Sequence, residues 1–438
     1  MAESHYLSWG RYPRFPQAGT ELLWRSDPLP ELPADAGQML PYGAGRSYGD
    51  VCLNRGGTVL ATRALRHFIE FDREAGTLRC EAGVTLEEIA RLTLPAGWWL
   101  PVTPGTAFAT VGGAVANDVH GKNHHRVGTF GCHVLRFELL RSDGSRRVCT
   151  AEQHAQLFAA TIGGLGLTGL ITWVEIKLRP VRGAWLDTET LKFGHADDLL
   201  KLSAGSESGH EYTVAWLDCA ATGARLGRGL FTRANHADTA AAMPRRRAPG
   251  VPFTPPVSLV NRYSVRLFNA VWYARQRERR RARRVPMHAF FYPLDAIAHW
   301  NRIYGPRGML QHQAVLPGAD GPAALREMLK QISRAGTGSF LAVAKVFGAV
   351  KSPGMLSFPR PGVSLALDFP MSPDTLRLLG RLDALTLECG GAVYPAKDAC
   401  MDPRLFRAGF PQWEEFATHV DPAFSSSFWR RVTGDGLD

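Results

Sequence analysis

The segment from Pro101 to His125 concentrates residue types that suit the binding of a phosphate-bearing cofactor. It reads PVTPGTAFATVGGAVANDVHGKNHH, and its glycine pair, Gly112 and Gly113, stands between Thr110 and a run of small apolar residues. This order predicts a loop that turns into a helix, and the first N–H groups of a helix have no acceptor within it. We therefore expect these N–H groups to face an anion such as a cofactor phosphate.

A second glycine-rich loop, PYGAGRSYGD, lies at residues 41–50, after a polar and proline-rich stretch at residues 26–38. Its glycines permit tight conformations, and Arg46, Ser47 and Tyr48 offer hydrogen-bond donors to a pyrophosphate. One such loop alone is more often an ordinary turn. Two loops in one half of the chain, the other followed by the histidine-rich HGKNHH, favour a dinucleotide site.

Length and composition limit the class of protein. A chain of 438 residues exceeds one usual hydrophobic core, which predicts two domains or one large domain with a cap. No apolar run approaches a membrane span, and the N-terminal residues lack the basic-then-apolar order of a secretory signal, so we expect synthesis in the cytoplasm without cleavage.

The cysteines and histidines do not suggest a disulfide scaffold or a metal site. The seven cysteines are scattered and form no CxxC pair, so we expect mostly buried thiols. His124 and His125 have no carboxylates or thiols at ligand spacing, and no metal is predicted.

The net charge of +11 is concentrated in two patches. Arg275 to Arg284 holds seven arginines against Glu278, and Arg245 to Arg247 add three. The remainder is nearly balanced, which argues against a nucleic-acid partner. The apolar and aromatic residues from Tyr263 to Tyr273 precede the larger patch and favour an anionic lipid surface. A solvated, partly disordered surface loop without a partner is an equally open alternative.

The residues that position these motifs alternate between strand and helix patterns. We expect strands at 58–61, 77–81, 134–140 and 170–178, helices at 86–92 and 111–117, and a hairpin turn at Asp143-Gly144. A later region shows strand patterns at 212–217 and 364–368 and a helix pattern at 323–335. The mixture indicates an α+β fold around a nucleotide cofactor.

The motifs GAGRSYGD, PGT, TVGGAVANDVHGKNHH and GGLGLTG (residues 163–169) resemble the FAD-binding (PCMH-type) half of the vanillyl-alcohol oxidase superfamily. Within it they are similar to the branch that oxidises prenyl-phosphate-linked ribose, and the similarity continues through residues 291–295, 300–306, 345–348 and 394–398. The resemblance implies a two-domain vanillyl-alcohol-oxidase-type fold. Its FAD-binding domain comprises residues 1–183 and 392–438, and its β-sheet substrate (cap) domain comprises residues 184–391, with a basic insert around 240–285.

The resemblance also implies which residues contact the FAD. These are Gly43, Gly45, Arg46, Ser47, Tyr48, Gly49, Pro104, Gly105, Gly112, Gly113, Asn117, His120, Gly121, Asn123, His124, Ile171 and Tyr394. Several superfamily members bind FAD covalently through a histidine at the place of Arg46. Arginine cannot form that bond, so we expect non-covalent FAD with Arg46 as a phosphate or ring-edge donor.

Lys397, in the motif YPAKD, is the first catalytic candidate, because the resemblance places it beside the flavin ring and the substrate. There it stabilises negative charge on the reduced flavin or orients a hydroxyl, and partial burial lowers its pKa. His120 is the second candidate, as a hydrogen-bonding group at the site.

The resemblance places a sugar and phosphate pocket at Lys122, Trp216, Tyr292, Gln311, Gln313, Lys345 and Ser364, where the lysines suit a phosphodiester. The chain departs from the family at three positions. Ser364 stands where Asn is frequent, Val214 where Ser is frequent, and Ala366 where mycobacterial members carry a cysteine. Ala366 predicts resistance to inhibitors that bond to that cysteine.

The function implied is FAD-dependent oxidation of the 2-hydroxyl of a polyprenyl-phosphate-linked ribofuranose to a 2-keto sugar, the first half of an epimerisation to arabinose for the cell envelope. An NAD(P)H-dependent keto-reductase, a quinone or other electron acceptor and a membrane surface are the implied partners, with the protein on the cytoplasmic side of the inner membrane. The alternatives are an oxygen-using oxidase of a soluble alditol or sugar lactone, and a non-enzymatic lipid or nucleic-acid binding protein on a flavin fold.

Overall fold

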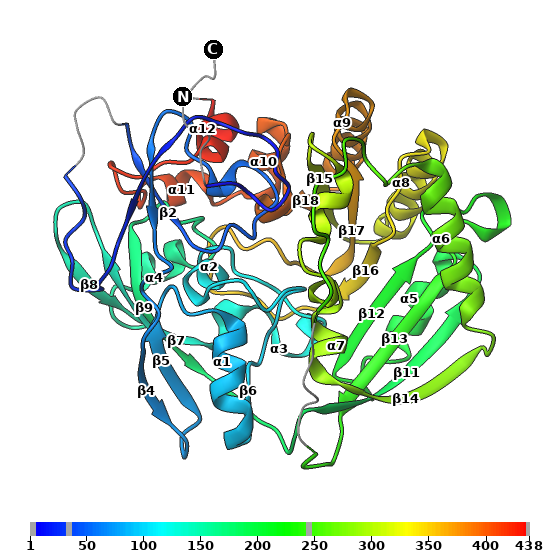
Figure 1. Ribbon diagram of the computed structural model, residues 1–438, viewed down its shortest axis with the longest axis horizontal. Coiled ribbons are helices and arrows are strands. Elements are labelled where there is room, and N and C mark those ends of the chain that lie inside the picture. Colours follow the sequence, from blue (N-terminus) through cyan, green and yellow to red (C-terminus); the bar gives the residue numbers. More distant parts are fainter. Residues whose placement is uncertain (1–5, 32–36, 242–247, 435–438) are drawn as a thin grey trace.

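The strands of this α+β chain form four sheets within the part of the chain that the computed structural model describes, residues 6–31, 37–241 and 248–434. Figure 1 shows the strands from the N-terminal half on one side of the molecule and a large sheet from the middle of the chain on the other. The expected mixture of helix and sheet is confirmed.

The N-terminal half contains a five-stranded antiparallel sheet of order β4-β5-β9-β7-β8. Its strands are β4 Phe68–Asp72, β5 Thr77–Glu81, β7 Val134–Leu140, β8 Arg146–Cys149 and β9 Leu170–Lys177. The expected Asp143-Gly144 turn joins β7 to β8, where Gly144 adopts a φ of 78°. The smaller sheets consist of β1 Ala18–Glu21, β2 Met39–Tyr42 and β3 Thr58–Ala61, all parallel, and of β6 Trp98–Trp99 with β10 Arg179–Pro180.

The two helices expected in this half, at 86–92 and 111–117, begin at the predicted residues. Helix α1, Leu86–Thr93, starts at a capping box formed by Thr85 and Glu88, which satisfies its first N–H groups. Helix α2, Val111–Ala116, packs on β9. The other helices here are α3 His124–Val127 and α4 Ala155–Thr161.

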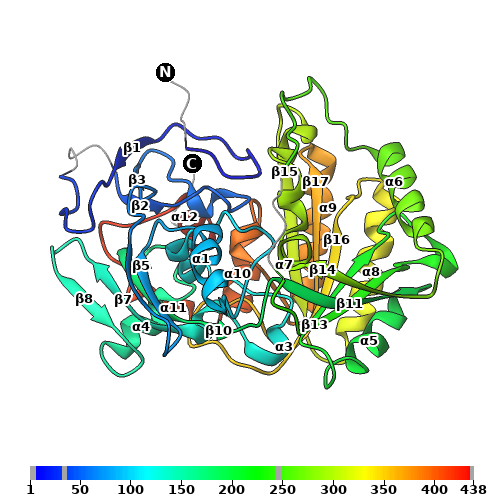
Figure 2. The same cartoon turned by 60° about the horizontal axis from the view of Figure 1, so that its bottom comes forward.

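The second half is built on an eight-stranded antiparallel sheet of order β14-β11-β13-β12-β16-β17-β15-β18. Its strands are β11 Trp185–Phe193, β12 Tyr212–Leu217, β13 Gly229–His236, β14 Arg280–Pro286, β15 Met309–Leu316, β16 Ala342–Phe347, β17 Gly362–Pro370 and β18 Ala392–Val393. Helices α5 Ala196–Ala204, α8 Gly321–Ala335 and α9 Pro373–Glu388 pack on one face of this sheet. Its other face is therefore available to the N-terminal half (Figure 2).

The C-terminal residues return to the N-terminal half. The C-terminal helices are α10 Pro403–Gly409, α11 Trp413–Ala417 and α12 Ser427–Thr433. Helix α12 packs on the helical turn Asp50–Cys52 that follows β2 (Figure 1). The main chain also joins the C-terminal residues to β2, because the N–H of Met39 donates to the carbonyl of Ala423 over 2.7 Å. Strand β18 pairs with β15, so residues 392–393 are part of the eight-stranded sheet. The division into two domains stays a prediction.

The arginine-rich run is more ordered than a surface loop. Helix α6, Arg262–Arg275, and the edge strand β14 contain it, while helix α7, Met287–Phe291, follows directly. The alternative of a partly disordered loop is wrong for these residues, because β14 pairs with β11 over seven positions. Arg245 to Arg247 lie outside the described residues. None of the helices in the described ranges combines the length and apolar character needed to cross a membrane.

Candidate active site

One face of the eight-stranded sheet carries most of the predicted substrate residues. Residues directly opposite each other in antiparallel strands point to the same face. Gln311 pairs with Asp368, Gln313 with Ala366, and Lys345 with Ser364. Trp216 joins the same face through its pairing with Val343, which also pairs with Ala366. We call this set the polar face of the sheet; the alternate residue His312 points to α9, where its Nε2 lies 2.9 Å from Asp383.

His120 contacts the polar face from the N-terminal half. The amide nitrogen of Gln313 lies 2.8 Å from His120 Nε2 and 3.3 Å from the hydroxyl of Ser364. Because an amide nitrogen donates, His120 Nε2 accepts. Burial, followed by the charge of Lys345, lowers the pKa of His120 well below its ordinary value, so the imidazole is neutral near pH 7. The ring also packs 4.8 Å from Phe347 and 5.6 Å from Tyr394.

Lys397 lies over the aromatic ring of Tyr48, with Nζ 3.8 Å from the ring centroid. Asp368 is fully buried within electrostatic range of Lys397, and its Oδ1 accepts a hydrogen bond from Gln311. Burial lowers the pKa of Lys397 to about 7. Burial also raises the pKa of Asp368 to about 7. The pair can therefore hold or release one proton in the neutral range.

Two further lysines, Lys345 and Lys122, are buried close to each other. Lys345 Nζ lies 3.5 Å from the carbonyl of Gly121, and burial lowers its pKa to about 8. Lys122 Nζ donates to the carbonyl of Phe291 over 2.8 Å. Burial, followed by the charge of Lys345, lowers the pKa of Lys122 well below its ordinary value. Crowded lysines of this kind recover their charge when an anion binds among them.

The first glycine-rich loop suits the phosphates of a dinucleotide. The main-chain N–H groups of residues 44–47 have no hydrogen-bond acceptor among the described residues. Successive free N–H groups form an anion-binding concavity. Arg46 lies 4.4 Å over the ring of Trp9 and 5.2 Å over that of Phe108, and its buried Nε has no partner in the described part of the chain. These unsatisfied donors fit a bound FAD.

The start of α2 is different from the expectation. The N–H groups of Val111 and Gly112 donate to the carbonyls of Val84 and Ala82, and Gly113 N–H donates to the hydroxyl of Thr110. The prediction that these groups are free for an anion is wrong, because the turn after β5 accepts the first two and the hydroxyl of Thr110 accepts the third. The two loops nevertheless meet, since a Cβ on Gly43 would lie 2.5 Å from Thr110 Oγ1.

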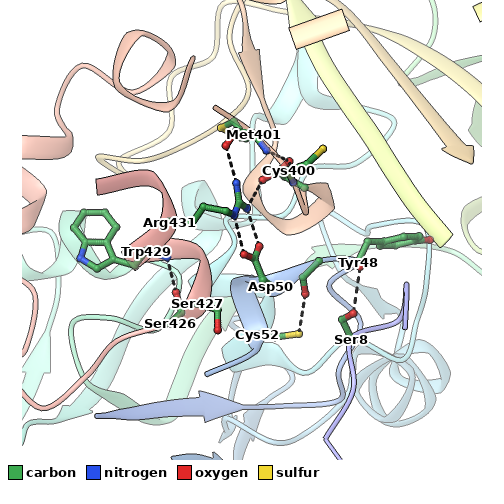
Figure 3. A network of polar contacts seen from close by, with 12 residues as sticks. Ser8, Tyr48, Asp50, Cys52, Cys400, Met401, Ser426, Ser427, Trp429 and Arg431 are labelled. Atoms are coloured by element: carbon green, nitrogen blue, oxygen red, sulfur yellow. Dashed lines mark hydrogen bonds and ion pairs between the residues drawn. The ribbon is translucent and has the colours of Figure 1, made fainter. Parts of the chain in front are cut away.

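The Lys397 segment is joined to the first loop by a buried ion-pair network (Figure 3). Arg431 of α12 donates to both carboxylate oxygens of Asp50 and, over 2.8 Å, to Asp398. The N–H of Tyr48 donates to the carbonyl of Ala396 over 2.9 Å. A Cβ on Gly49 would lie 1.5 Å from the carbonyl of Asp398, so only glycine permits this approach. The network fixes Tyr48 and Lys397 relative to each other.

The other predicted cofactor residues surround α2 and the segment after it. The hydroxyl of Tyr394 donates to the carbonyl of Asn117 over 2.7 Å, and Ile171 is buried on β9 beneath α2. Asn123 donates to the carbonyl of Pro101 and is fully buried. His124 is buried 4.7 Å from Phe347, and its pKa is lowered to about 4, chiefly by burial. Gly105 is exposed, with Pro104 beside it.

Trp216 and Tyr292 lie at the margin of the predicted pocket. Trp216 Nε1 donates to the carbonyl of Phe340 over 2.9 Å, which fixes the indole on the sheet. Tyr292 is buried at the end of α7, next to the carbonyl that accepts Lys122. Within the described part of the chain, no hydrogen bond, ion pair or ring contact joins either residue to Lys397 or His120, so their roles stay predictions.

A cleft of about 510 Å³ opens beside the first loop. Gly45, Arg46 and Trp9 line it together with Phe253 and Arg302. Its lining joins the first loop to residues that precede α6 and β15, so the cleft is a candidate entrance to the site.

Three residues of the site were not identified from the sequence. Asp368 follows Ser364 and Ala366 at a spacing of two, and that alternation places it on the polar face. Asp295 accepts hydrogen bonds from the hydroxyl of Thr106 and the N–H of Ala107, which positions the second loop. The pairing of Arg431 with the first loop joins residues 381 apart in the chain, and no local signal indicates it.

Metal ligation has no support in the described ranges, where no group of three or more His, Cys, Asp or Glu side chains is placed to hold an ion. Cys80, Cys149 and Cys219 are buried and the other four cysteines are partly buried.

Comparison with known proteins supports FAD binding by the N-terminal half. The family model of an FAD binding domain matches residues 33–150. A decaprenylphosphoryl-beta-D-ribose oxidase of Mycolicibacterium smegmatis is 35% identical over 411 residues, which cover 90% of this chain and 89% of that protein. An uncharacterised Streptomyces coelicolor protein from the mprA 5′ region is 34% identical over 80% of this chain and 100% of its own. Human Delta(24)-sterol reductase is 30% identical over 27% of this chain and 23% of its own.

Proposed function

Because the chain belongs to the decaprenylphosphoryl-beta-D-ribose oxidase family of FAD-dependent oxidoreductases, we propose that it oxidises the 2-hydroxyl of a polyprenyl-phosphate-linked ribofuranose to a 2-keto sugar. FAD, when bound, supplies the acceptor for the hydride that leaves the carbon. The sugar is bound and oriented by the side chains of the polar face together with His120. Lys397 accepts the proton of the sugar hydroxyl.

The observation that carries this proposal is the charge of the site. Lys345 and Lys397 both act electrostatically on His120, Lys345 also acts on Lys122, and Asp368 is the acidic residue that acts on Lys397. A neutral alditol brings no charge to these crowded amines, whereas a phosphodiester brings a negative charge that favours their protonated forms.

Lys397 and Asp368 are the proposed holders of the hydroxyl proton. With the pKa of Lys397 lowered to about 7, a substantial fraction of its amine is unprotonated in the neutral range. Asp368, whose pKa is raised by burial and which interacts electrostatically with Lys397, is the proposed second holder of the same proton. A neutral His120, held by Gln313, serves as a hydrogen-bonding group that orients the sugar.

The product and the reduced cofactor require partners. We propose an NAD(P)H-dependent reductase that converts the keto sugar to the arabinose epimer, and a quinone or another acceptor that reoxidises the flavin. A lipid-linked substrate would place the enzyme at the inner membrane, on the cytoplasmic side. The FAD is proposed to be held without a covalent bond, since Arg46 occupies the attachment position.

The direct test is anaerobic loss of flavin absorbance. Purified yellow protein is mixed with a short-chain prenyl-phosphate ribose, with its arabinose epimer, and with xylitol or a sugar lactone. Rapid bleaching by the prenyl-phosphate ribose alone is the expected result. Bleaching by xylitol or the lactone with release of peroxide in air would instead establish the soluble-substrate oxidase. Flavin that no alcohol bleaches would establish a non-enzymatic binding protein.

A further inference from the structure

Helix α6 exposes an apolar row to solvent. Tyr263, Leu267 and Val271 are spaced by four residues, and their exposed fractions are 66%, 68% and 60%. Residues four apart lie on the same side of a helix. On the opposite side, Val265 and Asn269 are buried, and the amide of Asn269 donates to Asp218 over 3.1 Å. One side of the helix therefore packs on the protein, while its apolar row is exposed to solvent.

The segment that leads into α6 extends this apolar surface. Phe253, Val257 and Leu259 are exposed by 66%, 67% and 52%. Phe253 also lines the cleft that contains Gly45 and Arg46. We call these three residues and the row of α6 the α6 patch. Exposed apolar groups of this number on one short stretch mark an interaction surface.

Arginines surround the patch. Residues 262–284 contain nine arginines and one glutamate. Arg280 and Arg284 are engaged by Glu189 and Asp187 of β11. Arg266, Arg277 and Arg279 are exposed, and none of them has an acidic partner within the described ranges. The unneutralised charge therefore lies next to the apolar row, at the end of the molecule where Figure 1 shows α6.

An apolar helix face with unpaired arginines around it is complementary to the surface of an anionic membrane. A bilayer of anionic phospholipids takes the apolar side chains at the boundary of its acyl chains and the arginines at its phosphates. A nucleic acid would satisfy the arginines and leave the apolar row in water. A second copy of this chain would bring like charges together.

We propose that the α6 patch docks on an anionic phospholipid bilayer, with the row of α6 inserted at its interface. Because Phe253 belongs to the patch and also lines the cleft, docking through the patch brings this wall of the cleft to the membrane surface. This proposal rests on the proposed function only for the identity of what enters the cleft. The docking itself does not depend on catalysis.

The test uses FAD-loaded full-length protein and sedimentation with vesicles. One set contains phosphatidylglycerol and phosphatidylcholine in equal parts, and the other contains phosphatidylcholine alone. Wild type is expected to bind the anionic vesicles and to dissociate as salt rises. The double variant Leu267→Glu/Val271→Glu is expected to bind these vesicles at least about tenfold more weakly than wild type. The triple variant Arg266→Gln/Arg277→Gln/Arg279→Gln is expected to lose about fivefold per arginine.

Matched variants on α9 serve as controls. Leu387→Glu and Arg381→Gln change the same residue types at exposed positions of another helix, and both are expected to bind like wild type. Equal sedimentation of wild type and both α6 variants would overturn the proposal. Binding to duplex DNA without binding to vesicles would also overturn it. The same holds if wild type is a dimer in gel filtration and the double variant is a monomer. Retained yellow colour and bleaching of the variants by a soluble short-chain substrate would separate a docking defect from failure of the proposed function.

Discussion

At the scale of single residues, the proposed proton transfer depends on how burial changes the pKa values of Lys397 and Asp368. Water stabilises an ammonium and a carboxylate, and both groups lose that solvation in the site. The pKa of the lysine falls and that of the acid rises, so the two values meet in the neutral range. Neither residue would have this property on the surface.

Lys397→Ala tests the role of the amine. We expect the variant to keep FAD but to bleach about 100-fold more slowly with the prenyl-phosphate ribose, because a proton-transfer group is removed. Stopped-flow absorbance of the flavin measures the rate. Lys351→Ala, at an exposed position, is the control and should match wild type. A rate within a few-fold of wild type for Lys397→Ala would exclude the amine from the reaction.

Asp368→Asn tests the coupling through the pH profile. If the unprotonated amine is the active form, the bleaching rate of wild type rises as the pH rises through about 7. Asp368 acts to raise the pKa of Lys397, so its removal should move the rise to lower pH. Asp374→Asn on α9 should leave the profile unchanged. A shift to higher pH, or a rate that no longer depends on pH, would contradict this assignment.

At the scale of elements, α12 holds the site together without contacting the predicted substrate residues. Arg431 pairs with Asp50, at the end of the first loop, and with Asp398, next to Lys397. Both carboxylates are nearly fully buried. Burial raises the pKa of Asp50 even though Arg431 opposes that effect. The ion pairs therefore fix two separate segments at one point.

Arg431→Met should destabilise the protein by about 3–5 kcal/mol, because it leaves two buried carboxylates without a counter-charge. Urea denaturation of the FAD-loaded protein measures the change. Arg404→Met removes an exposed pair with Asp402 and should cost no more than about 0.5 kcal/mol. A loss that is equally small for Arg431→Met would show that the network does not stabilise the fold.

At the scale of the whole molecule, the site depends on segments from both halves of the chain. The first loop, the HGKNHH segment and the polar face meet around His120 and Lys397. A ligand that contacts all of them stabilises their arrangement by binding the folded state alone. The N–H groups of residues 44–47, which have no acceptor among the described residues, are the proposed contacts of the phosphates of that ligand.

FAD added to cofactor-free protein at about 100 times its Kd should raise the free energy of unfolding by about 2.7 kcal/mol. Riboflavin, which has the ring without phosphates, should give a much smaller increase at the same concentration. Thermal or urea unfolding with each ligand measures the difference. Equal stabilisation by both ligands would mean that the first loop does not bind the phosphates.

Local signals account for what the sequence predicted well. Strands β3, β5, β7 and β12 have the expected bounds, because short runs of apolar and β-branched residues, bounded by turn residues, specify them. The glycine loops and the YPAKD motif indicated FAD and the segments near it, since these motifs are contiguous in the chain. Local signals were misleading for the arginine run, where pairing with β11 makes a strand of residues that read as a solvated loop.

The sequence by itself determined the class of fold, the cofactor and the family. Only the tertiary structure decided which side chains share the site. Strand register places Asp368 opposite Gln311, and the return of the C-terminal helices places Arg431 against Asp50. The tertiary structure also showed that the N–H groups of Val111 and Gly112, at the start of α2, already donate to the turn after β5. These outcomes depend on contacts between distant residues, and the free energies of such contacts are set by packing and burial that no local pattern contains.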